Sequence, residues 1–207
     1  MPIDHNKYKG KVFKGSTFPD DPYKKVSVKL NSTIRNEYLP ALDKLPYNKG
    51  LKLLMTAMTH QEGFTAGDPA RKIKPSRSYR TNNPGNVGNT DIGANKILNT
   101  LTDGIKLQAE HLLKIAEGKS KRYPLGKRPP LDPYYSPEIA KNPNYGLPAH
   151  LPGYDFVYTG QLDQFIKIYS TGARVTNSYL NTITSYFADN GIEIKPETKL
   201  QTIVNLV

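Results

Sequence analysis

One stretch of the chain carries apolar residues at a helical spacing, and it leaves little choice of secondary structure. Between Asn48 and Glu62, apolar side chains recur every three or four residues, which places them on one side of a helix. They are Leu51, Leu54, Met55 and Met58, with Leu53 and Ala57 beside them. Gly63 follows, and glycine commonly ends a helix in the left-handed conformation. The stretch therefore predicts a buried helix that ends at Glu62.

Further segments show the same helical spacing of apolar residues. The first of these segments, from Ser32 to Pro46, contains Pro40. Pro40 should kink or restart the helix, because proline lacks an amide hydrogen and crowds the preceding turn. Thr102 is the expected N-cap of the second helix, and Gly118 its end. The segments are expected from Ser32 to Pro46, from Thr102 to Gly118, after Thr159, from Tyr179 to Gly191, and from Pro196 onward.

The expected β structure is small. Gly85 to Ile92 is rich in Gly and Asn around Val87, which suits a tight hairpin or a looped ribbon better than a helix. An irregular N-terminal arm, residues 1–31, contains one short candidate strand at Val26 to Val28. Residues 32–207 are expected to form one domain with a long Pro/Tyr-rich loop at 119–153, since a chain of 207 residues suits one substantial core. The predicted fold class is mainly α (α+β), with a small β-hairpin lobe beside a helical lobe.

Composition excludes several kinds of functional site. The chain has no Cys, which rules out thiolate nucleophiles and cysteine-based metal sites, and its four His residues lack metal-ligand spacing. We therefore expect no metal and no cofactor. No apolar run approaches the ~20 residues of a membrane span, and the N-terminus lacks the apolar core of a signal peptide. The net charge of +11 implies an acidic partner, but the charge does not distinguish nucleic acid from an anionic cell envelope or a membrane surface.

The sharpest chemical signal is Glu62 together with an Asn-rich segment that begins 17 residues later, at Tyr79. A carboxyl group that donates a proton at neutral pH needs its charged form to be disfavoured, and the carbonyls at a helix C-terminus act in that direction. Residues 82–86 supply amide donors and acceptors on a turn, which suits recognition of the acetamido and hydroxyl groups of an amino sugar. Glu62 is therefore a candidate general acid. The alternative interpretation is a solvated residue in the last turn of a helix.

These motifs resemble those of phage and prophage peptidoglycan hydrolases of the lysozyme and lytic-transglycosylase superfamily. The resemblance matches Glu62 to the family's catalytic acid and Arg80 with residues 82–86 to its hairpin motif, where Thr81 replaces the commoner Asn. The segment from Arg174 to Tyr179 is similar to the closing part of that fold. The resemblance implies a lysozyme-like fold, cleavage of the bacterial cell wall, and a set of substrate-binding residues: Tyr79, Asn82, Asn83, Asn86, Asn177 and Tyr179.

A second carboxylate usually assists glycoside cleavage, as base or nucleophile. Asp91 is the first candidate and Asp68 the second, whereas Asp103 is expected to stabilise the start of its helix. If no second carboxylate takes part, the substrate assists itself through its acetamido group or its 6-hydroxyl. The sequence does not decide between the product of a muramidase and that of a lytic transglycosylase. Tyr79 either packs in the core or lines the cleft, and His60 is expected to face solvent.

The resemblance also implies the partners. They are the glycan strands of peptidoglycan and, in a phage particle, other virion proteins; we expect neither nucleic acid nor membrane insertion. A wall enzyme without a signal peptide is expected in the virion or in the host cell, as an endolysin. Two alternatives remain: a catalytically silent virion component with a lysozyme-like scaffold, and a basic nucleic-acid-binding module, because Lys, Arg and Tyr interleave between Lys119 and Tyr158.

Overall fold

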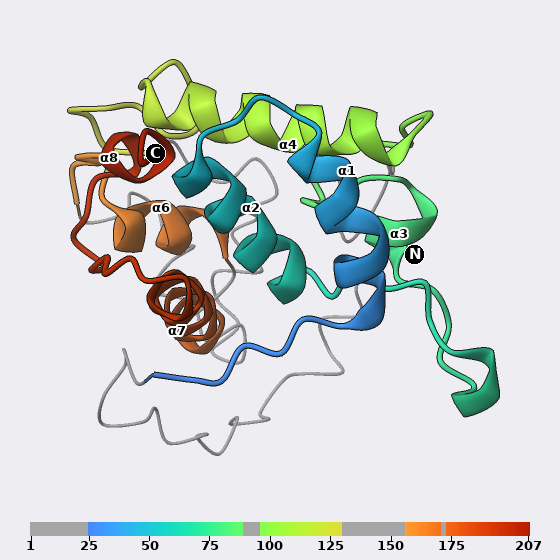
Figure 1. Cartoon of the computed structure of the whole chain (residues 1–207). Coiled ribbons are helices and arrows are strands. Elements are labelled where there is room, and N and C mark those ends of the chain that lie inside the picture. Colours follow the sequence, from blue (N-terminus) through green and yellow to red (C-terminus); the bar gives the residue numbers. More distant parts are fainter. Residues whose placement is uncertain (1–24, 89–95, 130–155, 171–172) are drawn as a thin grey trace, which may run out of the picture.

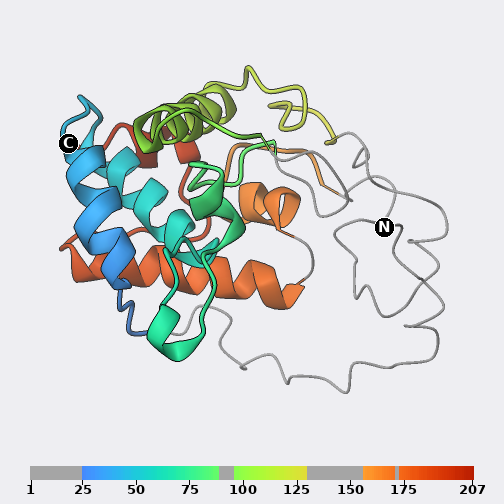
Figure 2. The same cartoon turned by 90° about the vertical axis from the view of Figure 1, so that its right-hand side faces the viewer.

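The chain folds into a mainly helical structure, seen here in a computed structural model that describes residues 25–88, 96–129, 156–170 and 173–207. One helix, α2, lies between α4 and α7 in both views of the molecule (Figure 1, Figure 2). The elements, in chain order, are η2 (Ile34–Tyr38), α1 (Leu39–Asp43), α2 (Lys49–Gln61), η3 (Pro69–Arg71), α3 (Arg77–Arg80), α4 (Leu101–Ala116), α6 (Leu162–Tyr169), α7 (Ala173–Asp189) and α8 (Leu200–Val204). None of the helices in these ranges is both long and apolar enough to cross a membrane.

Helix α2 forms the centre of the core, and its prediction from the sequence is confirmed. It packs against α4, α7 and α8, so both its apolar stripe and its flanks are buried. Leu54, Met55 and Ala57 are fully inaccessible to solvent. A helix that is apolar on most sides must lie inside its domain, because no side of it can face water without cost. Glu62 follows directly as the C-cap residue of this central helix.

Helix α2 approaches α8 closely at its first turn. Gly50 donates its backbone N–H to the carbonyl of Leu206 at 2.9 Å. A Cβ on Gly50 would lie 1.9 Å from the carbonyl oxygen of Ile203, so only glycine allows this approach. The start of α2 is thereby fixed against the last helix of the chain.

Pro40 does not break the first helix, which runs without interruption over residues 32–43. The turn before Pro40 is instead a π-helix, in which the amide of Leu39 donates to the carbonyl of Ile34, five residues earlier. The wider turn accommodates a residue that lacks an amide hydrogen and would crowd an ordinary α-helical turn. At Pro40 the helix thus changes from a π-helical turn to the α-helix α1, in which Pro40 is the second residue.

Helix α4 begins two residues before the position predicted from the sequence. Its N-cap is Thr100, not Thr102: the Thr100 side chain accepts from the amide of Asp103 at 3.1 Å, and the Asp103 carboxylate accepts from the amide of Thr100. This reciprocal pair is a capping box. The expectation that Asp103 stabilises the start of its helix is therefore confirmed, and Gly118 ends the helix region in the left-handed conformation as predicted.

The last three helices follow the sequence pattern, with one correction. The helices expected after Thr159 and up to Gly191 are α6 and α7. Pro196, expected to open the final helix, lies in a turn, and α8 starts only at Leu200. Proline is favoured in turns as well as in the first turn of a helix. The position of Pro196 alone therefore does not determine where α8 begins.

The expected β-hairpin lobe is not found in the part of the chain that the structure describes. The segment from Gly85 to Gly88 consists of turns, and residues 89–92 lie outside the described ranges. Residues 26–28 are extended but pair with no strand; the amide of Val26 donates to the Ser185 side chain on α7 instead. Within the described residues, β pairing is limited to two isolated antiparallel bridges, at Asp68 with Ile73 and at Gln161 with Lys199.

His111, on α4, makes the stability of this fold depend on pH. Burial, then the charges of Arg122 and Lys114, lowers the pKa of His111 to about 4. The unfolded chain binds a proton at this residue below pH ~6.5, whereas the folded protein resists it, so stability is lost as the pH falls from about 6.5 toward 4. Between pH 7 and pH 5 we expect His111 to account for a loss of roughly 1–2 kcal/mol in the free energy of unfolding.

Urea denaturation of the parent protein and of the His111→Gln variant at pH 7 and pH 5 measures this contribution. The variant cannot titrate at this position, so its stability should depend less on pH than that of the parent. Equal pH dependence of the two proteins would contradict the assignment to His111.

Candidate active site

Glu62 owes its position to the way α2 ends. The amide of Gly63 donates to the carbonyl of His60 at 3.0 Å, and the amide of Phe64 donates to the carbonyl of Thr59 at 3.3 Å. Gly63 has a φ of 65°, so the pair of bonds forms a Schellman motif. The ring of Phe64 is buried against the core, and Glu62 is half-buried at the end of the helix. The backbone direction at Glu62 is therefore fixed on both sides of the residue.

Three side chains from three separate segments donate hydrogen bonds to the Glu62 carboxylate. Tyr169, the last residue of α6, donates from its hydroxyl to Oε1 at 2.8 Å. Tyr179, on α7, donates to the same oxygen. Asn86 donates from Nδ2 to Oε2. A carboxylate offers about four lone-pair positions, so the contacts within the described residues leave one position, on Oε2, for a further partner.

The two tyrosines act as hydrogen-bond donors rather than as charges. Burial, followed by the charge of Glu62, raises the pKa of Tyr169 and of Tyr179 above the ordinary value. Both hydroxyls therefore keep their protons at neutral pH. Their rings lie 5.6 Å apart at an interplanar angle of 67°, an edge-to-face contact that restricts both side chains.

The hydroxyl of Tyr169 has a second acceptor, the carbonyl of Gly85, at 3.0 Å. When Glu62 is ionised, this hydroxyl can donate to the carboxylate. When Glu62 is protonated on Oε2, Tyr169 can keep its bond to Oε1 or turn its hydroxyl to the Gly85 carbonyl. The Tyr169 hydroxyl therefore has an acceptor in either protonation state of Glu62, without movement of heavy atoms.

The turn that carries Asn86 is held in place by its own asparagines. Asn83 is fully buried; its Nδ2 donates to the carbonyl of Val87 at 2.9 Å, and its Oδ1 accepts from the amide of Val87 at 3.0 Å. Asn82 donates to the carbonyl of Leu98 at 3.1 Å. Asn82 and Asn86 have φ values of 51° and 48°, a conformation that asparagine tolerates better than most residues. The Asn-rich segment therefore shapes the turn, and only Asn86 reaches Glu62.

Two glycines let this turn approach α4. A Cβ on Gly104 would lie 1.7 Å from the carbonyl oxygen of Asn82, and a Cβ on Gly85 would lie 2.7 Å from the side chain of Gln108. Gln108 is itself buried and hydrogen-bonded to Tyr38 and to the backbone of Met55 on α2. The turn, α4 and α2 are thereby fixed relative to one another.

Other residues predicted for substrate binding lie away from this carboxylate. Tyr79 packs its ring 5.4 Å from that of Phe64 and donates its hydroxyl to Glu37 at 3.2 Å. Asn177 is half-buried on α7, two residues before Tyr179. Of the six predicted residues, Asn86 and Tyr179 contact Glu62 directly. A role in substrate binding stays a prediction for all six.

Among the residues that the structure describes, no candidate for a second carboxylate is hydrogen-bonded near Glu62. Asp91 lies outside the described residues. Asp68 caps η3, where its Oδ1 accepts from the amides of Ala70 and Arg71 at 3.0 and 3.3 Å. His60, expected to face solvent, is half-buried, and this burial lowers its pKa. No cluster of three or more His, Asp or Glu side chains that could hold a metal occurs in the described ranges.

Tyr169 is the residue at Glu62 that the sequence did not single out. It lies on the same helical stripe as Leu162, Phe165 and Ile166, a pattern that indicates only burial. Tyrosine differs from phenylalanine by a hydroxyl that needs a partner when buried. The need of a buried tyrosine hydroxyl for a partner is the sequence signal that points to Tyr169. It does not say that the partner is Glu62.

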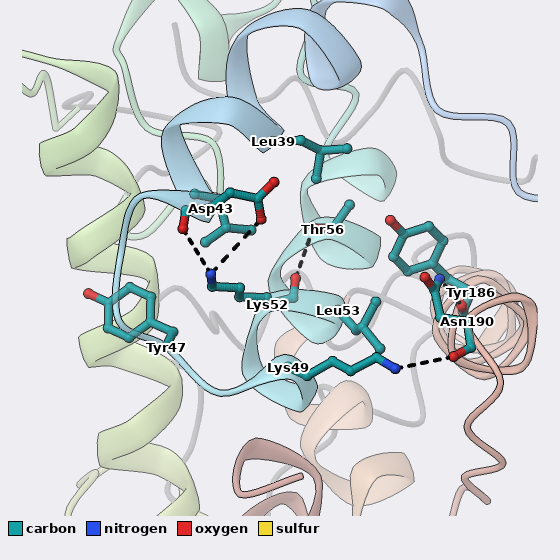
Figure 3. Close-up of a pocket in the computed structure, with 10 residues that line it drawn as sticks. Leu39, Asp43, Tyr47, Lys49, Lys52, Leu53, Thr56, Tyr186 and Asn190 are labelled. Atoms are coloured by element: carbon teal, nitrogen blue, oxygen red, sulfur yellow. Dashed lines mark hydrogen bonds and ion pairs between the residues drawn. The ribbon is translucent and has the colours of Figure 1, made fainter. Parts of the chain in front are cut away.

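The structure also contains a surface hollow far from Glu62, with a volume of about 360 Å³. Figure 3 shows that Lys52 points toward Asp43, and Lys49 toward Asn190, across a surface lined by leucine side chains. These lysines belong to the first half of α2, and at 1.5 Å per residue Lys49 lies about 20 Å along the helix axis from Glu62. The hollow is therefore separate from the candidate active site.

Searches against protein-family models, curated proteins and solved structures gave no match to this chain. The functional argument therefore depends on the residues around Glu62.

Proposed function

We propose that this protein cleaves the glycan strands of bacterial peptidoglycan, with Glu62 as the general acid. The observation that carries the proposal is Glu62 at the end of a buried helix, with Tyr169, Tyr179 and Asn86 donating to its carboxylate. These donors favour the carboxylate that is left after proton transfer, whereas the helix C-terminus was expected from the sequence to disfavour the charged form. The motif resemblance to phage lysozymes and lytic transglycosylases supports the same choice. We extend the proposal to a lysozyme-like fold and to a phage product that acts on the wall from the virion or from the host cell.

In the proposed reaction, Glu62 gives its proton to the oxygen of the scissile glycosidic bond. The open lone-pair position on Oε2 is the place where that oxygen would approach. The developing carboxylate is then stabilised by the tyrosine hydroxyls, which are already aimed at Oε1. The positive charge that develops on the sugar is met either by a second carboxylate, with Asp91 as the first candidate, or by the acetamido group or 6-hydroxyl of the substrate.

Digestion of purified peptidoglycan tests the proposal. We expect the protein to release soluble muropeptides, and mass spectrometry of their ends to identify the product. Anhydromuramic ends indicate a transglycosylase, reducing muramic acid a muramidase, and reducing glucosamine a glucosaminidase. If the folded protein releases no fragments at all, the proposal fails, and the two alternatives are a silent virion component and a nucleic-acid-binding module.

Tyr169 offers a second test, because its hydroxyl serves Glu62 and the Gly85 carbonyl together. The Tyr169→Phe variant keeps the ring but loses the bond to a charged group, which is worth about 1.5–3 kcal/mol. We expect muropeptide release to slow by roughly ten- to a hundredfold. Tyr47→Phe is the matched control, since it removes a tyrosine hydroxyl from the separate hollow beside the first half of α2. Equal slowing of both variants would contradict a specific role for Tyr169.

A further inference from the structure

A cationic loop, residues 66–75, projects beyond the helices between α2 and α3. Figure 1 and Figure 2 both show η3 at its outer end, clear of the helical body. Residues 69–75 are exposed, and they include Arg71, Lys72 and Lys74. Arg77 and Arg80 follow on α3, so residues 68–80 contain five basic residues and a single acidic one, Asp68. The loop is the part of this region that a large partner would meet first.

The lone acidic residue does not neutralise the loop. Asp68 accepts from two backbone amides and lies 3.4 Å from Nε of Arg71, whose side chain is 79% exposed. This carboxylate thus caps η3 and balances at most one of the cations. Lys72 and Lys74 are exposed, so their charges contribute to a positive surface at the loop.

Hydrogen bonds hold the loop in one shape. At its base, the amide of Ser76 donates to the carbonyl of Thr65 at 2.9 Å, and the amide of Ala66 donates to the Thr33 hydroxyl at 3.0 Å. Near its outer end, Asp68 and Ile73 exchange two backbone hydrogen bonds of 2.8 and 2.9 Å. The backbone that carries the cations is therefore already ordered, which reduces the entropy lost when a partner binds.

The loop is also tied to the candidate active site through the chain. Its base at Thr65 lies three residues after Glu62, and its return leads through α3 to the turn that carries Asn86. A long partner that rests on the loop would therefore lie beside the proposed reaction site.

We propose that the cationic loop docks the protein onto a phosphodiester polymer of the bacterial cell wall, a polyol phosphate. The choice of a wall polymer rests on the proposed function; the choice of a repeating anion rests on the loop. Cations spread over an exposed projection fit a repeating phosphodiester better than one small ion, which needs converging donors.

Residues 66–75 contain no aromatic side chain to stack on nucleic-acid bases. Ile73, 50% exposed, is the one large apolar residue of the loop, too little for insertion into a lipid surface.

Binding to purified poly(glycerol phosphate) tests the inference, measured by fluorescence anisotropy over a salt series. The test variant is Arg71→Gln/Lys72→Gln/Lys74→Gln. The control, Lys106→Gln/Lys195→Gln/Lys199→Gln, removes the same charge from exposed positions elsewhere. We expect the test variant to bind about tenfold or more weakly and with a flatter salt dependence, because fewer counterions are released. The control should lose less than about threefold.

Equal weakening of both triple variants would overturn the inference, because net charge alone would then explain binding. Tighter binding to a single-stranded DNA oligonucleotide, or to vesicles of phosphatidylglycerol, than to the polyol phosphate would also overturn it. The polymer contains no glycosidic bond of peptidoglycan, so these results do not depend on Glu62. A protein that binds the polymer through the loop but releases no muropeptides would support the docking surface while refuting the proposed function.

Discussion

The Glu62→Gln variant is expected to fold like the parent protein and to lose peptidoglycan cleavage almost completely. The amide has the shape of the carboxyl group, and its oxygen can still accept from Tyr169 and Tyr179. Its nitrogen would face Asn86, whose side-chain amide can turn to present its oxygen. The variant cannot donate a proton to a glycosidic oxygen. General acid catalysis contributes about a hundred- to ten-thousandfold, and muropeptide release should fall by that range.

Glu110→Gln is the matched control, because Glu110 is an exposed carboxylate on α4. Thermal unfolding followed by circular dichroism should show similar midpoints for both variants and the parent. Muropeptide release by Glu62→Gln at the parent's rate would remove Glu62 from the mechanism and leave the wall-cleaving activity to other residues.

The Gly104→Ala variant is expected to lose both stability and activity. Its Cβ would lie 1.7 Å from the carbonyl oxygen of Asn82 and 2.8 Å from the ring of Pro84, distances at which atoms overlap. Alanine favours a helix over glycine by about 1 kcal/mol, but overpacking of this kind typically costs 1–3 kcal/mol or more. The turn must move away from α4, and Asn86 moves with it. We expect a net loss of about 2 kcal/mol in the free energy of unfolding.

Urea denaturation measures the stability, and muropeptide release at a temperature where the variant is folded measures the displacement of the turn. Glu110→Ala is the control on the same helix, and its stability should change by no more than about 0.5 kcal/mol. If Gly104→Ala kept the parent's stability and activity, the close approach of the turn to α4 would not be required for the site.

The helices could be predicted from the sequence where local signals agreed. In α2, the apolar period and Gly63 both indicated the same end, and the structure places it there. In α4, two threonines stood near the start, and only the reciprocal contact with Asp103 decides between them. The hairpin expected from Gly85 to Ile92 is not found in its described part, Gly85 to Gly88, which consists of turns. Gly and Asn favour positive φ values in many turns, and without partner strands the same residues form irregular turns.

The site could be predicted only in part, because its contacts join distant segments. Glu62 and Asn86 were recognisable from their motifs. Among Asn82, Asn83 and Asn86, however, the sequence offers no means of telling which side chain faces the carboxylate, since that depends on the backbone conformation at each position. Tyr169 comes from a helix whose spacing indicates only burial.

The hydrogen bonds on Glu62 have a consequence for the order in which the protein becomes active. Tyr169 is 107 residues away from Glu62 along the chain, and Tyr179 is 117 residues away. Contacts of such separation close large loops and tend to form late in folding. A nascent chain that ends before residue 169 contains Glu62 but neither hydroxyl. The proposed proton donor therefore gains its full set of partners only after most of the chain has been synthesised and α6 and α7 have packed.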